Sequence, residues 1–170
     1  NYDNTKPQII EALKKYDSHQ YLINRLSKNG QRYLFYTVSE ALKRDLPVEL
    51  SLIPFIESQF DPYAQSSTGA SGIWQFIPST ALENGLKKNW WYDARRDIVA
   101  STEAAYNFLV KLHQEHDDWL IAIAAYNAGP SRVRKEIRKN KAKGLPTDFW
   151  SLNLPKETKA YVPKILALSE

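Results

Sequence analysis

The stretch WLIAIAAYNAG, which runs from Trp119 to Gly129, is apolar on nearly every side of a helix. A helix of this kind offers no polar face to water, so it is buried among other elements. The dipeptide Gly129-Pro130 ends it, since proline cannot continue the helical hydrogen-bond ladder. The sequence therefore predicts a central helix over 119–128, against which the rest of the chain packs.

Amphipathic and capped segments on both sides of this stretch predict further helices. They cover 6–16, 21–28, 31–44, 78–84 and 97–116. We also expect Ser131 to cap a basic helix that ends near Gly144, and Pro155 to start the last helix. Strand signals are weak, although a small hairpin fits between Ser58 and Phe76. The expected fold is mainly α-helical, with about eight to nine helices.

The segment PVELSLIPFIES, from Pro47 to Ser58, contains two prolines. Proline fits a first helical turn, so Pro47 is expected to open a helix. Pro54 lies inside the same segment, where it should kink the helix and free a carbonyl one turn back. The helix should end around Ser58, because the residue before Pro62 avoids the helical conformation.

Length and composition limit the class of protein. A chain of 170 residues suits one domain. The chain contains no cysteine, which excludes disulfides and thiolate metal sites, and its net charge of +4 permits an anionic partner without requiring one. No apolar run approaches the ~18–20 residues that span a bilayer. Methionine is absent even at position 1, so we expect a fragment or a processed form.

The sequence indicates no metal or cofactor site. The three histidines, His19, His113 and His116, include no pair with zinc-site spacing and an attached acid. Walker, dinucleotide and nucleophile-elbow motifs are also absent. The run 132–143 holds seven lysines and arginines and one glutamate. Such a run usually forms a solvated helix face; the alternative is that it attracts an anionic polymer.

Glu57 is the strongest candidate for catalysis. It follows an apolar run, and burial in an apolar pocket disfavours the charged form of a carboxyl. Such a group can donate a proton near neutral pH, which acid-catalysed cleavage of a glycosidic bond requires. The alternative is a glutamate that faces water at a helix end. The following loop carries Ser66 and Gln75, which suit sugar hydroxyl and acetamido groups but are equally common in ordinary turns.

Three ordered blocks carry a resemblance. They are ESQFDPYAQSSTGASGIWQFIPST from Glu57, AYNAG from Ala125, and ETKAYVPK from Glu157. Together they resemble the lytic transglycosylase family, whose fold is lysozyme-like. We expect a single catalytic domain over 1–170, in which helices of 1–45, which match no family motif, pack on a lysozyme-like core of 46–170. The nearest branch adds sugar-binding LysM repeats, and no such repeat occurs in this sequence.

The resemblance implies a bacterial, periplasmic enzyme that cleaves the β-1,4 bond between N-acetylmuramic acid and N-acetylglucosamine in peptidoglycan. It implies that Glu57 is the only catalytic carboxylate. Glu57 would protonate the leaving oxygen and then take the proton of the sugar's own 6-hydroxyl as that hydroxyl attacks the anomeric carbon. The product is a 1,6-anhydromuramic acid end. No cofactor and no nucleic-acid partner are expected, and attachment to the outer membrane would use a lipid outside this chain, which we expect to be a monomer.

The resemblance also implies roles for individual residues. By motif position, Ser66 and Gln75 contact the substrate near Glu57. Tyr126 lines the site and helps to orient Glu57, through a hydrogen bond that we expect between the two, and Asn127 lies beside it.

Two further positions follow from the motif blocks. Tyr161 matches a tyrosine that reaches the cleft in relatives. Trp74 stands where many relatives carry methionine; it would narrow the cleft or add a stacking face for the substrate, or simply pack.

Two other functions fit the same fold. A goose-type lysozyme-like hydrolase would require a second acid to hold a water, and Asp61, four residues after Glu57, fits a turn-capping role better. Most glycosidases do use two carboxylates. The other alternative is an inactivated domain that only binds glycan. The presence of Glu57, Ser66, Gln75 and Tyr126 argues against it.

Overall fold

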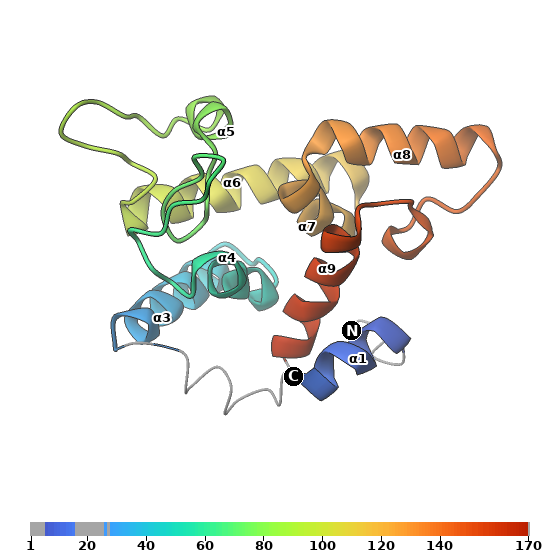
Figure 1. Cartoon of the computed structure of the whole chain (residues 1–170), viewed down its shortest axis with the longest axis horizontal. Helices are drawn as coiled ribbons and strands as arrows, with labels where there is room; N and C mark the ends of the chain where they lie inside the picture. Colours follow the sequence, from blue (N-terminus) through green and yellow to red (C-terminus); the bar gives the residue numbers. More distant parts are fainter. Residues whose placement is uncertain (1–5, 16–25, 27, 170) are drawn as a thin grey trace.

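The structure is a computed structural model that describes residues 6–15, 26 and 28–169. In these residues the chain forms eight α-helices and two short 3₁₀-helices, joined by irregular loops (Figure 1). The elements are α1 (Pro7–Lys15), α3 (Lys28–Lys43), η1 (Val48–Leu52), α4 (Ile53–Ser58), α5 (Pro78–Glu83), α6 (Ile98–His116), α7 (Trp119–Ala128), α8 (Pro130–Ala142), η2 (Phe149–Ser151) and α9 (Lys156–Leu168). The mainly α-helical prediction is therefore confirmed. None of the helices in this part of the chain is both long and apolar enough to cross a membrane.

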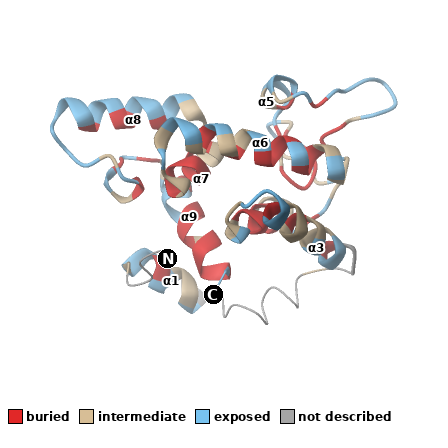
Figure 2. Ribbon diagram, turned by 180° about the vertical axis from the view of Figure 1, so that it is seen from behind, coloured by how far each residue is buried: buried red, intermediate tan, exposed pale blue. Residues whose placement is uncertain are grey.

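Helix α7 is the buried centre, as its sequence predicts. It packs against α6, α8 and α9, and residues 120–125 are all buried. The Asp118 carboxylate starts it by accepting the amide hydrogens of Leu120 and Ile121, and Gly129, with φ 89°, ends it. Figure 2 shows buried residues concentrated on α7 and α9, whereas α8 exposes most of its length.

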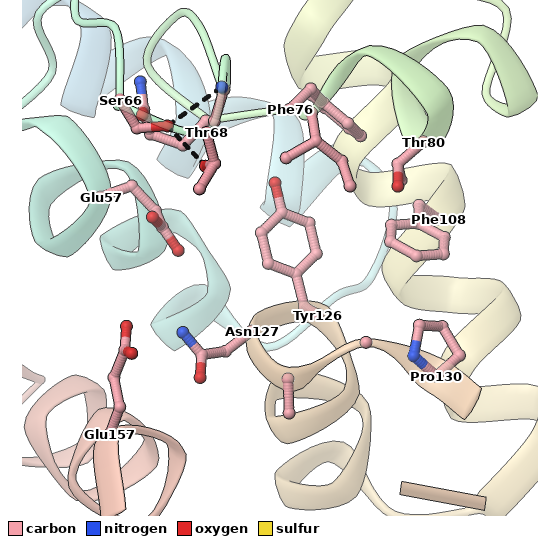
Figure 3. Close-up of a pocket in the computed structure, with 15 residues that line it drawn as sticks. Glu57, Ser66, Thr68, Phe76, Thr80, Phe108, Tyr126, Asn127, Pro130 and Glu157 are labelled. Atoms are coloured by element: carbon pink, nitrogen blue, oxygen red, sulfur yellow. Dashed lines mark hydrogen bonds between the residues drawn. The ribbon is translucent and has the colours of Figure 1, made fainter. Parts of the chain in front are cut away.

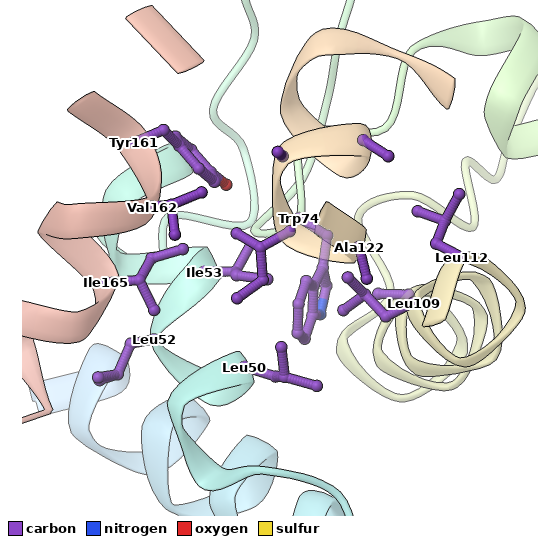
Figure 4. Packing of buried hydrophobic residues seen from close by; sticks show 14 of the residues in the cluster. Leu50, Leu52, Ile53, Trp74, Leu109, Leu112, Ala122, Tyr161, Val162 and Ile165 are labelled. Atoms are coloured by element: carbon purple, nitrogen blue, oxygen red, sulfur yellow. The ribbon is translucent and has the colours of Figure 1, made fainter. Parts of the chain in front are cut away.

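The core joins residues from distant parts of the chain (Figure 4). Leu50 and Ile53 come from the η1–α4 segment, Leu109 from α6 and Ile165 from α9, and all four are fully buried. Trp74 lies among them, with no exposed surface. Burial of this apolar area, at roughly 25 cal/mol per Å², holds α6 and α9 against α7 and α4 against α9.

The expectation of one kinked helix from Pro47 to Ser58 is wrong. The segment forms a 3₁₀-helix, η1, followed by a separate helix, α4, and Pro54 lies in the first turn of α4. The amides of a first turn have no partner within the helix, so a proline there costs no hydrogen bond and begins a helix instead of kinking one. The predicted end at Ser58 is confirmed, because Gln59 adopts a left-handed conformation with φ 52°.

The loop after α4 is irregular. The hairpin that fitted between Ser58 and Phe76 is reduced to isolated bridges, which pair Ser71 with Gln65 and with Phe76. Buried Arg95 supports the loop instead, since its guanidinium donates to the carbonyl oxygens of Gly69 at 2.8 Å and Phe76 at 3.2 Å. Such hydrogen bonds from a buried cation to backbone fix the loop that carries the polar groups of the site.

The remaining helices follow the predicted ranges closely, with one correction. Ser131 does not cap α8, which begins at Pro130 with Gly129 before it. Proline is already suited to a first helical position, so the helix starts one residue early. The helix expected over 21–28 falls almost entirely outside the described residues. In the rest of the chain, α1 packs on α9 and α3 packs on η1.

Candidate active site

Glu57 faces a cleft of about 400 Å³. The cleft walls come from the end of α4, the loop 59–77, α5, α6, the end of α7 and the start of α9 (Figure 3). The end of α4 places Glu57 at the cleft because Ser58, the next residue, donates its hydroxyl hydrogen to the Ile73 carbonyl at 2.9 Å. Segments far apart in sequence thus meet around one half-buried carboxyl.

The pKa of Glu57 is raised to about 7. Burial is the main cause, because it disfavours the charged carboxylate. A hydrogen bond from Tyr161 acts in the opposite direction, and the negative charge of Glu157 adds to the increase. A carboxyl with this pKa is present in both protonation states near neutral pH, so it can give up a proton and take one back.

Tyr161, on α9, is the hydrogen-bond partner of Glu57. Its hydroxyl donates to Oε1 of Glu57 at 2.5 Å, and burial raises the pKa of this tyrosine well above its ordinary value. The expectation that Tyr126 would make this bond is wrong, since the Tyr126 hydroxyl donates to the Trp74 carbonyl at 2.7 Å. Figure 3 shows that hydroxyl pointing toward the loop that carries Phe76.

Tyr126 nevertheless lines the cleft, as expected. Its ring packs against Phe76, at 6.1 Å between centroids, and against Phe108, at 5.8 Å. The three rings form an apolar wall on one side of the cleft (Figure 3). Tyr126 therefore joins the wall to the loop backbone and does not contact the carboxyl through its hydroxyl.

Ser66 and Gln75 both line the cleft. The Ser66 hydroxyl oxygen accepts from the Ala70 amide at 3.0 Å and shares a hydrogen bond with the Thr68 hydroxyl at 2.9 Å. The Gln75 amide nitrogen donates to the carbonyls of Ala64 and Gly72. Its donors are thus used by the loop, and no described residue bonds its amide oxygen, so Gln75 offers the substrate an acceptor.

Asn127 also lines the cleft, and its amide oxygen accepts from the Thr158 hydroxyl at 2.8 Å. That bond leaves the amide hydrogens for the cleft. Figure 3 shows the side chains of Glu57, Asn127 and Glu157 directed toward the same part of the cleft. The Asn127 amide hydrogens, near the carboxyl groups of Glu57 and Glu157, can therefore donate to an acceptor atom of a ligand.

Sequence reasoning missed Glu157 as a site residue, although it begins the ETKAYVPK block. It lies in the first turn of α9, four residues before Tyr161, and therefore on the same helix face. That spacing is the signal that would have found it. Glu57 therefore has an acidic neighbour in the cleft.

Three aspartates, Asp61, Asp93 and Asp97, lie outside the cleft and have structural roles. Asp61 accepts from the Tyr63 amide and caps its own turn, as expected. Asp93 pairs with Arg95 at 2.6 Å, and Asp97 caps α6. The part of the chain that the structure describes therefore offers Glu157 as the carboxylate beside Glu57.

The structure overturns the expectation that Trp74 adds a stacking face to the cleft. Its side chain is fully buried, packs edge-on against Tyr106 at 5.3 Å and donates its indole hydrogen to the Thr102 hydroxyl. Trp74 is linked to the cleft by its backbone carbonyl, which accepts the hydrogen bond from the Tyr126 hydroxyl. The packing alternative is correct, because the indole belongs to the hydrophobic core and contacts Thr102 and Tyr106 of α6.

Comparison with known proteins agrees with this geometry. A family model for the transglycosylase SLT domain matches residues 37–148. The chain belongs to the transglycosylase SLT domain family. Over 164 residues it is 49% identical to membrane-bound lytic murein transglycosylase D of Escherichia coli (strain K12), covering 96% of this chain and 36% of that protein. The chain thus spans about a third of the length of this relative.

Solved structures of the family have the same fold. The 70 kDa soluble lytic transglycosylase of Escherichia coli is similar with a TM-score of 0.57 and 26% identity, over 72% of this chain and 21% of that one. The lytic transglycosylase Slt of Pseudomonas aeruginosa, solved as an inactive glutamate-to-glutamine mutant, is similar with a TM-score of 0.59 and 30% identity. That match covers 78% of this chain and 22% of the other.

Proposed function

We propose that this SLT domain is a peptidoglycan lytic transglycosylase. It cleaves the β-1,4 bond between N-acetylmuramic acid and N-acetylglucosamine and leaves a 1,6-anhydromuramic acid end. The observation that carries the proposal is a glutamate with a pKa of about 7, held by Tyr161 in a polar and aromatic cleft. The names of its relatives support the reaction, and an inactive glutamate-to-glutamine mutant of one of them supports the dependence on a glutamate.

In the first step, protonated Glu57 gives its proton to the oxygen that leaves with N-acetylglucosamine, as the bond from that oxygen to the anomeric carbon breaks. The carboxylate that remains is stabilised by the hydrogen bond from Tyr161. In the second step, this carboxylate takes the proton of the muramic 6-hydroxyl while the hydroxyl oxygen bonds to the anomeric carbon. Glu57 ends protonated, and no water is consumed.

The second step needs water to be kept from the anomeric carbon. The apolar wall of Phe76, Phe108 and Tyr126 is suited to that exclusion. An attacking hydroxyl that is already part of the bound substrate has a large entropic advantage over a free water. Ser66, Gln75 and Asn127 would hold the sugar hydroxyl and acetamido groups around Glu57.

The setting of the enzyme is part of the same proposal. Its partner is the glycan strand of peptidoglycan, in the cell envelope of a bacterium, in the periplasm and at the outer membrane through a lipid outside this chain. The chain acts as one catalytic domain over 1–170 and as a monomer. The packing of α1 on α9 and of α3 on η1 supports one domain.

Glu157 favours one alternative, a hydrolase in which it holds an attacking water. Digestion of purified sacculi in heavy-oxygen water separates the two reactions. The proposed reaction releases unlabelled anhydro ends, which mass spectrometry identifies. A hydrolase releases reducing ends that are heavier by one water and carry the label. A majority of labelled reducing ends would overturn the proposal.

A further inference from the structure

A second groove lies outside the active-site cleft, on the loop that joins α5 to α6. Its volume is about 540 Å³, within the usual range for ligand pockets. Four aromatic side chains line it, together with Asn89 and four charged residues. The aromatic residues are Tyr63, Trp90, Trp91 and Tyr92. In Figure 1 this loop projects from the body of the molecule beside α5.

The two tryptophans are among the most exposed large side chains of the described chain. Trp90 is 88% exposed and Trp91 is 90% exposed, and Tyr63, which faces the same groove from another loop, is 74% exposed. These indoles contribute little to the fold, because they bury almost no area. A cluster of exposed apolar side chains around a groove typically marks a binding surface.

Hydrogen bonds within the loop hold the backbone that carries the two indoles. The Asn89 side-chain oxygen accepts the amide hydrogens of Trp91 and Tyr92 at 2.9 and 2.8 Å, and the Asn89 amide donates to the Tyr92 carbonyl at 2.8 Å. The Tyr92 hydroxyl donates to Asp97 at 2.9 Å. A platform that is ordered before binding loses less conformational entropy when a ligand arrives.

The groove and the active-site cleft share one loop. Tyr63 lines the groove, and Ser66, three residues later, lines the cleft. The loop between α5 and α6 is also bound to this loop, since the Arg96 Nε donates to the Ser71 hydroxyl at 3.2 Å and Arg95 donates to the Gly69 carbonyl. A ligand long enough to leave the cleft along this loop can therefore reach the groove.

The charges of the groove indicate which ligand it suits. Two basic residues, Lys88 and Arg96, are balanced by two acidic ones, Asp93 and Asp97. Lys88 lies 3.9 Å from Asp93, so its charge is partly neutralised. Loops that bind anionic bilayers carry an excess of basic charge, and this groove has none. A neutral ligand with apolar faces and many hydroxyl groups fits better.

We propose that the groove binds an outlying part of the peptidoglycan glycan strand, with pyranose rings stacked on Trp90 and Trp91. Sugar C–H groups would lie against the electron-rich faces of the indoles. Neighbouring polar side chains, such as Asn89 and Arg96, would bind sugar hydroxyls. The inference rests on the proposed function, because it assumes that the ligand in the cleft continues as a glycan strand.

The test measures binding of peptide-free glycan strands, prepared by treating sacculi with an amidase. The chain carries Glu57→Gln so that strands stay intact. Adding Trp90→Ala and Trp91→Ala should weaken binding about tenfold, which corresponds to ~1.4 kcal/mol, without changing the melting temperature. The matched control is Phe35→Ala, which removes another exposed aromatic ring outside the groove and should leave binding unchanged.

Two results would overturn the inference. One is equal affinity of the double variant and its parent for the strands. The other is binding to vesicles of phosphatidylethanolamine and phosphatidylglycerol that depends on the tryptophans, while strand binding does not. Failure of the proposed function would look different, because labelled reducing ends would replace anhydro ends whatever the strand affinity.

Discussion

Tyr161 donates a 2.5 Å hydrogen bond to Oε1 of Glu57, although 104 residues separate the two along the chain. The bond joins α9 to the end of α4. It favours the ionised carboxylate, whereas burial and the charge of Glu157 favour the protonated form. The balance of these effects, a pKa of about 7, is what the two proton transfers require of Glu57.

Replacement of Glu57 by glutamine removes the proton that is donated. We expect sacculus lysis, followed by turbidity, to fall by roughly 10²–10⁴-fold or more. Asp61→Asn is the control, because Asp61 caps a turn outside the cleft, and it should keep most activity. If the Glu57→Gln variant retains a third of the wild-type activity, Glu57 is not the catalytic acid.

The Glu57→Gln variant should also be more stable than the wild type, by an amount that depends on pH. The pKa of Glu57 is higher in the folded chain, about 7, than its ordinary value of 4.5. The folded state therefore binds more protons between these values, and wild-type stability falls as pH rises through this window. Glutamine does not titrate, so the variant should melt higher than wild type by a larger margin at about pH 8 than at about pH 5. A margin that is equal at both pH values would contradict the raised pKa.

Tyr161→Phe removes the hydrogen bond that lowers the pKa of Glu57. The pKa should rise further, so the alkaline limb of the pH–activity profile should move to higher pH. Maximal turnover should fall about tenfold, equivalent to losing one hydrogen bond to a charged group, ~1.4 kcal/mol. Tyr126→Phe is the matched control: it frees the Trp74 carbonyl but leaves the alkaline limb in place. If Tyr126→Phe moves the limb and Tyr161→Phe does not, the assignment of the two tyrosines is reversed.

Glu157→Gln removes a negative charge that raises the pKa of Glu57. The alkaline limb should then move to lower pH, by less than about one unit, because Glu157 is exposed and its charge is screened. Glu83→Gln, at the exposed end of α5, should leave the limb unchanged. Products analysed in heavy-oxygen water should remain anhydro ends. A loss of activity of roughly 10²-fold or more at every pH would instead favour Glu157 as a catalytic base.

Gly72 is required by a close approach of two backbones. It has φ +83°, and a Cβ atom there would lie 1.7 Å from the Arg95 carbonyl oxygen. Gly72→Ala should therefore lower the free energy of unfolding by about 3 kcal/mol or more, measured by urea denaturation. Gly85→Ala has a similar φ of +79° but open space around the new atom, so it should cost only about 1–2 kcal/mol. Equal losses would show that the contact with Arg95 is unimportant.

The basic helix α8 contains cations of two kinds. Arg134 pairs with Glu115 at 3.0 Å, whereas Arg132 and Lys135 form no ion pair with a described residue and line a shallow pocket beside Pro155. Reversing the charges of Arg132 and Lys135 should weaken sacculus binding at low salt and leave the products unchanged.

The control for that prediction reverses Lys141 and Lys143, at the far end of α8. Their reversal changes the net charge equally but should weaken binding less, because Gly129 and Pro130 place the start of α8 at the cleft. If sacculus binding by the wild type does not change across a salt titration, the basic residues of α8 form a solvated helix face and do not bind the substrate.

The sequence alone determined the features that depend on local chemistry. Apolar residues on all sides of 119–128 require burial, and Gly129-Pro130 ends that segment, so α7 could be predicted at its observed bounds. The apolar run before Glu57 likewise predicted the direction of its pKa shift. The role of Pro54 could not be predicted from the sequence, because a proline fits both a helix kink and a first helical turn. Which of the two forms depends on the packing of η1, which ends just before α4 begins.

Only the tertiary structure decided the partners of these groups. Tyr126 and Tyr161 both belong to motif blocks, and nothing in their neighbours states which hydroxyl reaches Glu57. That choice follows from where α7 and α9 lie relative to α4, and so do the burial of Trp74 and the position of Glu157 at the cleft. A hydrogen bond forms only over about 3 Å, and charge effects weaken with distance, so both depend on the relative placement of helices that burial of the whole core sets.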